Sequence, residues 1–460
     1  MEGTDRGRRS SAASTAVALL GLEADRPEAL RVAARALLAA RRSAAAAVVL
    51  ERLVALRPDD APAHALLGRA YATLGRRAEG RLALAKGIAL DPNDADARLL
   101  LADLLEADGE IDRARRQRES AFALRPIVVR PAARADAPRL LVTAAAGGGN
   151  TPLGIVETNA WSIALIAPEH LATTTPLPAY DLVLNTVSDA DGAPAALDAA
   201  ERLIGQSWRP VVNRPARLRA TGRAEMARRL ADVEGVVTAR TERWPRLALV
   251  PSSGPSRLLR AGWRFPLLLR PVGGHGGEGF VRVPNAVSLA SAASALATDE
   301  VFVIERLGTR RPDGQHRKIR LFLVDGLWHP WHMALSRHWK VHYFSSGMAR
   351  SAALRRLEAA FLADPEATLG APALLALDRI RPHLPFDLGG VDCDVAPDGR
   401  LVVFEANATM ALPEPPPGPE WDYRRDAHGA IRRHVERMLR ARLGTYGSDR
   451  ASARSSRPSP

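Results

Sequence analysis

The strongest chemical signal in the sequence is an acidic hairpin. Two apolar segments, residues 389–395 and 401–407, flank Pro397-Asp398-Gly399, a sequence that is typical of tight turns. If the last two residues of this turn are its central pair, Asp392 lies directly opposite Glu405. Directly opposed side chains have Cβ atoms about 4.5–5.5 Å apart. The sequence therefore predicts two carboxylates side by side on one face of a hairpin.

Two further polar residues fall on the same predicted face, because successive side chains of a strand alternate between its faces. They are Asp394 and Asn407. Carboxylate and amide oxygens suit a hard cation such as Mg²⁺, which also binds phosphates. A solvated sheet face with outward-pointing charges is the alternative. The single residue between Glu405 and Asn407, directly after an apolar strand, favours the metal site.

A glycine-rich loop follows a strand that carries a cation. Residues 265–271 form an apolar strand containing Arg270, and residues 273–279 hold five glycines in seven positions. Glycines let backbone N–H groups approach an anion closely, which predicts a phosphate-binding loop. The loop lacks the Gly-Lys-Ser/Thr ending of a P-loop. An ordinary hairpin loop is the alternative.

Lysine is rare in this chain, so its positions are informative. Only Lys86, Lys318 and Lys340 occur among 64 basic residues. Lys318 and Arg320 share one face of a predicted strand. A retained lysine indicates a need for a compact point charge where arginine would not serve.

Aromatic and basic residues cluster between Trp328 and His342. Arg337, Lys340 and His342 supply charge beside tryptophans, which predicts a substrate pocket. Zinc binding by the four histidines of this segment and a buried aromatic layer are the alternatives. Residues 147–152, at the carboxyl end of a strand, are a weaker candidate for contacting a ligand.

The elements that must hold these residues follow an amino-terminal repeat. Pro58, Pro92 and Pro126 are 34 residues apart and end similar phrases. Thirty-four is the tetratricopeptide period, in which each unit is a helix pair that buries its apolar face against its neighbour. The spacing predicts three units over residues 15–126. An alanine-rich helical bundle is the alternative.

The remaining chain changes from a parallel to an antiparallel pattern. Strands are expected at residues 139–145, 181–186 and 210–213, with helical stretches between them, which predicts an α/β layer. Hairpins from Arg217 onward predict α+β packing. The expected parts are a disordered start (1–14), helical repeats (15–126), a linker (127–138), the α/β layer (139–215), the α+β domain (216–444) and a disordered tail (445–460).

Composition narrows the classes of function. The 460 residues carry 64 basic and 51 acidic side chains, a net charge of +13. Nucleic-acid binding is disfavoured because no basic stripe with interleaved aromatics occurs. The single cysteine, Cys393, fits a reducing compartment, and no apolar run reaches the ~20 residues of a membrane span. A cytoplasmic protein is expected; a short signal peptide over residues 6–22 is the alternative.

The order of these features resembles the ATP-grasp superfamily, which includes D-alanine–D-alanine ligases, glutathione synthetases and ribosomal-protein glutamate ligases. The features are, in order, the cationic strand, the glycine loop, the strand that carries Glu305, the Lys318/Arg320 strand and the hairpin of Asp392, Glu405 and Asn407. The resemblance covers residues 140–440. It implies a pre-ATP-grasp α/β layer followed by an α+β ATP-grasp domain, both of which lie behind the tetratricopeptide-like helical repeats that the 34-residue period predicts.

The resemblance also implies roles for individual residues. Asp392, Glu405 and Asn407 would bind Mg²⁺, and Arg320 would stabilise the transferring phosphoryl group beside Lys318. Arg223 and Arg270 stand where relatives carry phosphate-binding lysines, and Glu305 would lie at the adenine-binding hinge. The flexible loop over the ATP phosphates would include Gly274, His275, Gly276 and Gly277.

The reaction implied is Mg-ATP-dependent activation of a small-molecule or peptide carboxylate as an acyl phosphate, which an amine then converts to an amide. The repeats would bind a protein or peptide partner. Because both usual lysines are arginine here, a nucleotide-binding scaffold without ligase activity is an alternative. An ATP-dependent kinase on the same fold is another.

Overall fold

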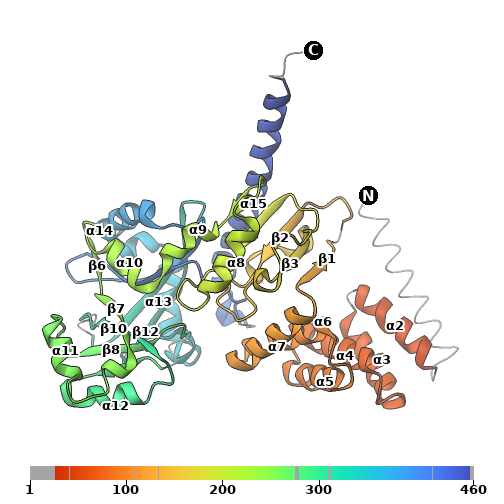
Figure 1. Ribbon diagram of the computed structural model, residues 1–460, viewed down its shortest axis with the longest axis horizontal. Helices are drawn as coiled ribbons and strands as arrows, with labels where there is room; N and C mark the ends of the chain where they lie inside the picture. The colour runs from red at the N-terminus through yellow and green to blue at the C-terminus, as the bar shows by residue number, and fades with distance from the viewer. Residues whose placement is uncertain are drawn as a thin grey trace. The chain divides into compact units, whose positions relative to one another are not determined.

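The computed structural model describes residues 26–40, 42–108, 110–132, 134–274, 279–308, 311, 313–416 and 418–455 (Figure 1). The chain divides into two compact units, Met1–Ile127 and Val128–Pro460. The stretch expected to be disordered at the start and the signal-peptide alternative lie outside the described residues.

The first unit contains three helix pairs. They are α2 (Pro27–Ala39) with α3 (Ser43–Leu56), α4 (Ala61–Thr73) with α5 (Arg77–Leu90), and α6 (Ala95–Ala107) with α7 (Ile111–Leu124). The first helices begin at 27, 61 and 95, and the second at 43, 77 and 111, so each unit repeats after 34 residues. The predicted repeat is confirmed.

Close helix packing explains the small residues of the repeat. A Cβ added at Gly68 would lie 2.5 Å from Cγ of Leu84. The first helices of the second and third pairs begin with capping aspartates, again 34 residues apart: Asp60 accepts a hydrogen bond from Ala63 N, and Asp94 from Ala97 N. The 34-residue period of the sequence is therefore the distance between the starts of equivalent helices.

A largely parallel sheet opens the second unit. Its strands are β1 (Ile127–Arg130), β2 (Arg139–Thr143), β3 (Ser162–Ile166), β4 (Leu182–Asn185) and β5 (Val211–Val212), in the order β1-β3-β2-β4-β5. The pairs β2–β3, β2–β4 and β4–β5 are parallel. Helix α8 (Pro194–Ile204) connects β4 to β5.

Two sequence predictions in this region are wrong. Residues 127–130 form strand β1 rather than linker, and β3 lies where a helical stretch was expected between β2 and β4. Four of the five residues of β3 are buried. A strand buried on both faces shows no alternation, so periodicity cannot separate it from a buried helix.

Two antiparallel sheets follow, as the hairpin pattern predicted. One has the order β7-β10-β8-β9, with β7 (Thr241–Pro245), β8 (Leu267–Pro271), β9 (Val281–Val283) and β10 (Glu300–Glu305). The other has the order β12-β11-β13-β14-β6, with β6 (Val236–Thr238), β11 (His316–Val324), β12 (Leu327–Ser336), β13 (Leu388–Val395) and β14 (Leu401–Asn407). Only β6 joins its neighbour, β14, in parallel.

Helices pack on these sheets through apolar faces. They are α9 (Pro215–Leu218), α10 (Arg223–Leu230), α11 (Gly254–Arg260), α12 (Leu289–Ser294), α13 (Ala352–Ala363), α14 (Pro365–Ile380) and α15 (Tyr423–Ser455). Helix α15 continues beyond Gly444, where a disordered tail was expected (Figure 1). The serine- and arginine-rich composition there does not exclude a helix, because the first proline is Pro458. None of the described helices combines the length and the apolar character that crossing a membrane requires.

Asn213 fastens the parallel sheet to the strand that carries the acidic residues. Its Nδ2 donates to Leu388 O at 2.8 Å, and its Oδ1 accepts from the N–H groups of Asp387 and Leu388 at 2.8 and 3.0 Å. Its backbone N–H donates to Asp387 Oδ2, and its carbonyl accepts from Asn185 Nδ2. The residue is fully buried with a φ of 58°, a left-handed conformation that asparagine tolerates.

Replacing Asn213 with glycine is expected to lower the free energy of unfolding by about 2–4 kcal/mol. Glycine keeps the positive φ without strain, so the loss reports the buried side-chain hydrogen bonds. Denaturant unfolding measures it. The control is Asn285→Gly, which removes an exposed cap bonded to Ser288 N and should cost only a few tenths of a kcal/mol. Equal losses in the two variants would contradict the fastening role of Asn213.

Candidate functional site

The hairpin of β13 and β14 places Asp392 directly opposite Glu405, as expected from the sequence. The turn differs from the expected one. Gly399 N donates to Ala396 O, Ala396 N donates to Arg400 O, and Gly399 has a φ of 85°. The loop therefore has three residues instead of two and ends in a left-handed glycine.

A β-bulge restores the register that the longer turn shifts. Cys393 pairs with Val403, whereas Asp392 pairs with Glu405, so Phe404 is the extra residue of β14. The shift in register caused by the longer loop is cancelled by the bulge, so Asp392 and Glu405 are paired across the hairpin. Asp394 does not join them, contrary to expectation: its Oδ1 accepts from Arg317 Nε at 2.6 Å in a buried ion pair.

Asp392 is buried between two cations of strand β11. Arg320 donates to both carboxylate oxygens, with Nε–Oδ1 at 2.6 Å and Nη2–Oδ2 at 2.8 Å. Lys318 Nζ donates to Oδ2 at 2.9 Å. Burial alone would raise the pKa of Asp392, but the charges of Arg320 and Lys318 hold it well below its usual range. The carboxylate is therefore ionised at neutral pH.

Glu405 lies at the centre of a second group of contacts. Arg223 Nη2 is 2.6 Å from Glu405 Oε1, and Asn407 Nδ2 donates to the same oxygen at 2.5 Å. Burial opposes ionisation, but Arg223 and Arg270 lower the pKa of Glu405 to about 2. Arg223 starts helix α10, so its side chain reaches the sheet from a separate element.

Arg270 completes the cluster from strand β8. Its Nη2 donates to Gly274 O at 2.7 Å, at the start of the glycine loop. Burial, then the charge of Arg223, lowers its pKa, against the opposing charges of carboxylates that include Glu405 and Asp392. Four cations thus surround these two carboxylates. We define these six residues as the charge cluster: Arg223, Arg270, Lys318, Arg320, Asp392 and Glu405.

Other expected site residues lie outside the charge cluster or outside the described chain. His275, Gly276 and Gly277 are not among the described residues. Glu305 ends β10, where its backbone N–H donates to Arg240 O at 2.9 Å and its exposed carboxylate accepts from Arg240 N at 3.3 Å. This contact joins β10 to the connection between β6 and β7, the junction of the two antiparallel sheets. Arg337 is exposed, and Lys340 N donates to His338 Nδ1.

The four histidines of the β12 segment have different neighbours. His329 Nε2 lies 2.7 Å from Nδ1 of His434, and His338 is exposed beside Trp339. His332 faces Arg320 in the register and packs on Tyr343, with ring centroids 4.8 Å apart. Burial and then the charges of Lys318 and Arg320 lower the pKa of His342. Only His332 and His342 therefore adjoin the charge cluster.

Sequence reasoning missed a buried polar network beneath β12. Glu358 accepts hydrogen bonds from Tyr343 Oη at 2.8 Å and from Tyr423 Oη at 2.5 Å. The guanidinium of Arg424 lies 4.4 Å from the centroids of both the Trp331 and Tyr343 rings. One signal was available: Glu358 lies three residues before Phe361, on the buried face of helix α13.

The chemistry of the hairpin fits a magnesium ion that arrives with a nucleotide. Mg²⁺ in such sites is usually held by one or two carboxylates together with substrate phosphates, rather than by a cage of protein ligands. Asp392 and Glu405 are ionised and opposed, and each carboxylate keeps lone pairs beyond those its present partners use. Within the described residues, no group of three or more His, Cys, Asp and Glu side chains forms a metal-binding set by itself.

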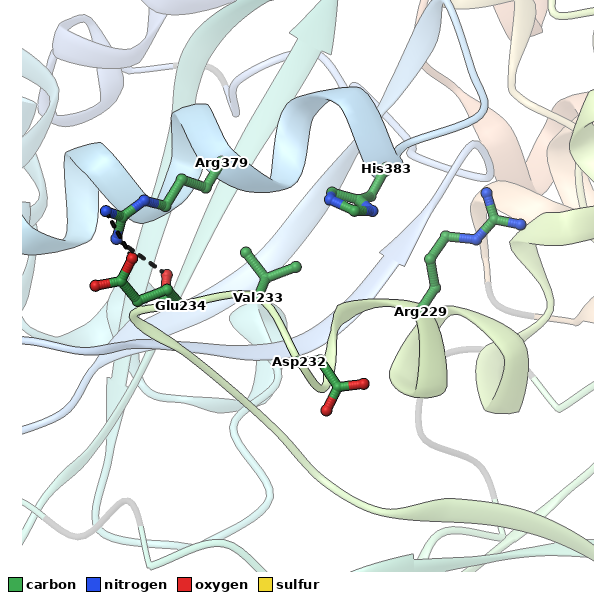
Figure 2. A pocket seen from close by; sticks show the side chains of 6 residues that line it. All are labelled: Arg229, Asp232, Val233, Glu234, Arg379 and His383. Atoms are coloured by element: carbon green, nitrogen blue, oxygen red, sulfur yellow. Dashed lines mark hydrogen bonds and ion pairs between the residues drawn. The ribbon is translucent and has the colours of Figure 1, made fainter.

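A cavity of about 390 Å³ lies elsewhere in the second unit (Figure 2). Its lining combines two arginines with two acids, and Arg379 Nη2 is 2.9 Å from Glu234 Oε2. Figure 2 shows His383 and Arg229 on the opposite side of Val233 from this ion pair. The cavity is lined by Arg229, Asp232, Val233, Glu234, Arg379 and His383. None of these residues belongs to the charge cluster. The cavity is therefore a separate feature.

No family model and no curated protein matches the sequence. Among solved structures, MamA is similar over 27% of this chain and 73% of its own, with 23% identity and a TM-score of 0.26. A thermophilic tetratricopeptide-repeat protein of Thermus thermophilus is similar over 26% of this chain and 67% of its own, with 25% identity and a TM-score of 0.24.

The D-alanine-D-alanine ligase from Coxiella burnetii is similar over 69% of this chain and 98% of its own, with 12% identity and a TM-score of 0.40. The described elements follow a fixed order: three 34-residue helix pairs, a parallel sheet, and two antiparallel sheets. This order of helical repeats, an α/β layer and α+β packing is the one that the sequence predicted.

Proposed function

We propose that the chain is a Mg-ATP-dependent ligase that activates a carboxylate and joins it to an amine. The observation that carries this proposal is the charge cluster. Two ionised carboxylates, which suit a divalent cation, lie among four cations that come from three separate elements. Cations that lie beside a carboxylate pair suited to a divalent metal favour a metal-bound polyanion such as a nucleoside triphosphate.

In this proposal, Arg223 and Arg270 bind the nucleotide phosphates, and Asp392, Glu405 and Asn407 hold Mg²⁺. When bound, Mg²⁺ supplies charge neutralisation at the phosphate oxygens. Arg320 lies beside the metal pair and stabilises the phosphoryl group during transfer, since phosphoryl transfer needs mainly positioning and charge. Lys318 holds Asp392 in place with Arg320.

The reaction proceeds in two steps. A carboxylate oxygen of the substrate attacks the γ-phosphorus of ATP, and ADP leaves as the acyl phosphate forms. The amine then attacks the acyl carbon, phosphate leaves, and the amine nitrogen releases a proton to give the amide. Arg337, Lys340 and His342, which follow β12, are proposed to line the acceptor side of this site.

The proposed carboxylate side is the loop of residues 147–152. Thr151 Oγ1 donates to Ala408 O at 2.7 Å, directly after the metal-binding strand β14. The loop is therefore connected to the end of the hairpin rather than to a distant surface. We propose that the helical repeats bind a protein or peptide partner, and that the protein works in the cytoplasm, where ATP is abundant.

Acceptor-dependent release of phosphate is expected from the wild-type protein with Mg-ATP, a carboxylate and an amine. Mass spectrometry of the product distinguishes the outcomes. An amide with one phosphate released per bond supports the ligase. A phosphorylated product without an amide would make the protein a kinase. Binding of Mg-ATP without turnover for any acceptor tested would favour a scaffold.

A further inference from the structure

The loop between β4 and α8 reaches across to the nucleotide side of the second unit through Asp191. We call residues 186–193 the β4–α8 loop. Oδ2 of Asp191 accepts a hydrogen bond from the backbone N–H of Arg223 at 2.7 Å. Oδ1 accepts from Arg243 Nη2, also at 2.7 Å. One carboxylate therefore joins helix α10 to strand β7.

The neighbouring sequence is adapted to this contact. Gly222 directly precedes helix α10, and a Cβ there would lie 3.1 Å from Asp191 Oδ1, closer than most side chains tolerate. Asp189 Oδ1 accepts from the N–H groups of Asp191 and Gly192, both at 2.9 Å, which fixes the turn that carries Asp191. A Cβ added at Gly192 would lie 3.2 Å from the Cα of Gly273, at the start of the glycine loop.

The contact fixes the backbone at Arg223, the residue whose side chain reaches the charge cluster. The first N–H groups of a helix have no partner within the helix, and a carboxylate placed there is stabilising. Asp191 binds the N–H of Arg223 and leaves its guanidinium for Glu405, 2.6 Å away. The first turn of α10 is thus fixed from one side while Arg223 reaches the charge cluster on the other.

We propose that Asp191 is a positioning residue for nucleotide binding, which holds Arg223 and the start of the glycine loop in the arrangement that receives the phosphates. This inference rests on the proposed function. It predicts that loss of Asp191 weakens binding of Mg-ATP more than it changes the use of the carboxylate or amine.

Asp191→Asn tests the proposal because both carboxylate oxygens accept a hydrogen bond. An amide has one accepting oxygen, so its NH₂ group must face an N–H donor of Arg223 or Arg243. The dissociation constant of Mg-ATP, measured by titration calorimetry, is expected to rise 10- to 100-fold. The KM values of the other two substrates should stay within about twofold, and Asp191→Glu should recover part of the affinity.

Asp198→Asn is the matched control. Asp198 also pairs with an arginine, Arg219 at 2.6 Å, but it lies on helix α8, which contributes no residue to the charge cluster. The Asp198→Asn variant should bind Mg-ATP as tightly as the wild type does. If Asp191→Asn does not fold, Gly222→Ala disturbs the same contact from the helix side and should weaken Mg-ATP binding 3- to 10-fold.

Two results would overturn the inference while the proposed function survived. One is a folded Asp191→Asn that binds Mg-ATP as tightly as the Asp198→Asn control. The other is an unchanged affinity in Gly222→Ala when Asp191→Asn is unfolded. A wild-type protein that does not bind Mg-ATP would instead remove the proposed function itself.

Discussion

Mg-ATP is expected to raise the thermal midpoint of the wild-type protein and to leave that of Glu405→Gln almost unchanged. A ligand that binds only the folded state stabilises it by about 2.7 kcal/mol at a hundred times its dissociation constant. Glutamine keeps the size of Glu405 and removes the charge that faces Arg223 and would face the metal. The measurement is thermal unfolding at neutral pH, where Glu405, with a pKa of about 2, is ionised.

One control variant and one further test variant separate metal binding from folding. Glu366→Gln changes an exposed glutamate in the first turn of α14 that is not a member of the charge cluster, and it should show the full wild-type shift. Asp392→Asn tests the second carboxylate, which both Arg320 and Lys318 bind. A folded double variant, Asp392→Asn with Glu405→Gln, that kept the whole Mg-ATP shift would show that this pair does not bind the metal.

Arg270→Met is expected to reduce turnover about a hundredfold or more. Methionine keeps the apolar stem and removes a cation placed at the nucleotide phosphates, an effect of roughly 2–4 kcal/mol on the transition state. Arg270→Lys should retain much of the activity because it keeps the charge. The Arg270→Lys variant loses the hydrogen bond from Arg270 Nη2 to Gly274 O, so some weakening of nucleotide binding is expected. Steady-state phosphate release with a responsive acceptor measures both variants.

Arg282→Met provides the comparison for Arg270→Met. Arg282 is exposed on the neighbouring strand β9, opposite Leu268 in the register, and should tolerate the same substitution with little change in turnover. Turnover in the wild type together with an unaffected Arg270→Met variant would refute the role of Arg270. The metal-site proposal would not be affected, because it depends on Asp392 and Glu405 of the β13–β14 hairpin.

The sequence by itself predicted the repeat and the general architecture, and the resemblance to a known family pointed to the members of the charge cluster. Helix starts at 27, 61 and 95 follow the proline spacing because each unit must bury the same face against its neighbour. Lys318 and Arg320 bind one carboxylate because alternate residues of a strand share a face. Such periodicities depend only on the order of residues along the chain, so they can be detected without the tertiary structure.

Other features depended on contacts between distant segments. Strands β1 and β3 were missed because a short or fully buried strand has no alternation to detect. Asp394 shares its strand with Asp392, but Arg317 draws it into a different ion pair. The correct pairing of Asp392 with Glu405 resulted from a turn one residue longer than expected and a bulge at Phe404 that offset it.

Tertiary structure alone decided the environment of each charge. Nothing in the sequence connects Asp191 to Arg223 and Arg243, which follow it by 32 and 52 residues and lie on two other elements. The four cations of the charge cluster come from α10, β8 and β11, and their pKa effects on Asp392 and Glu405 arise only when these elements meet. Electrostatic interactions depend on distance in space and on burial, and neither is specified by position along the chain.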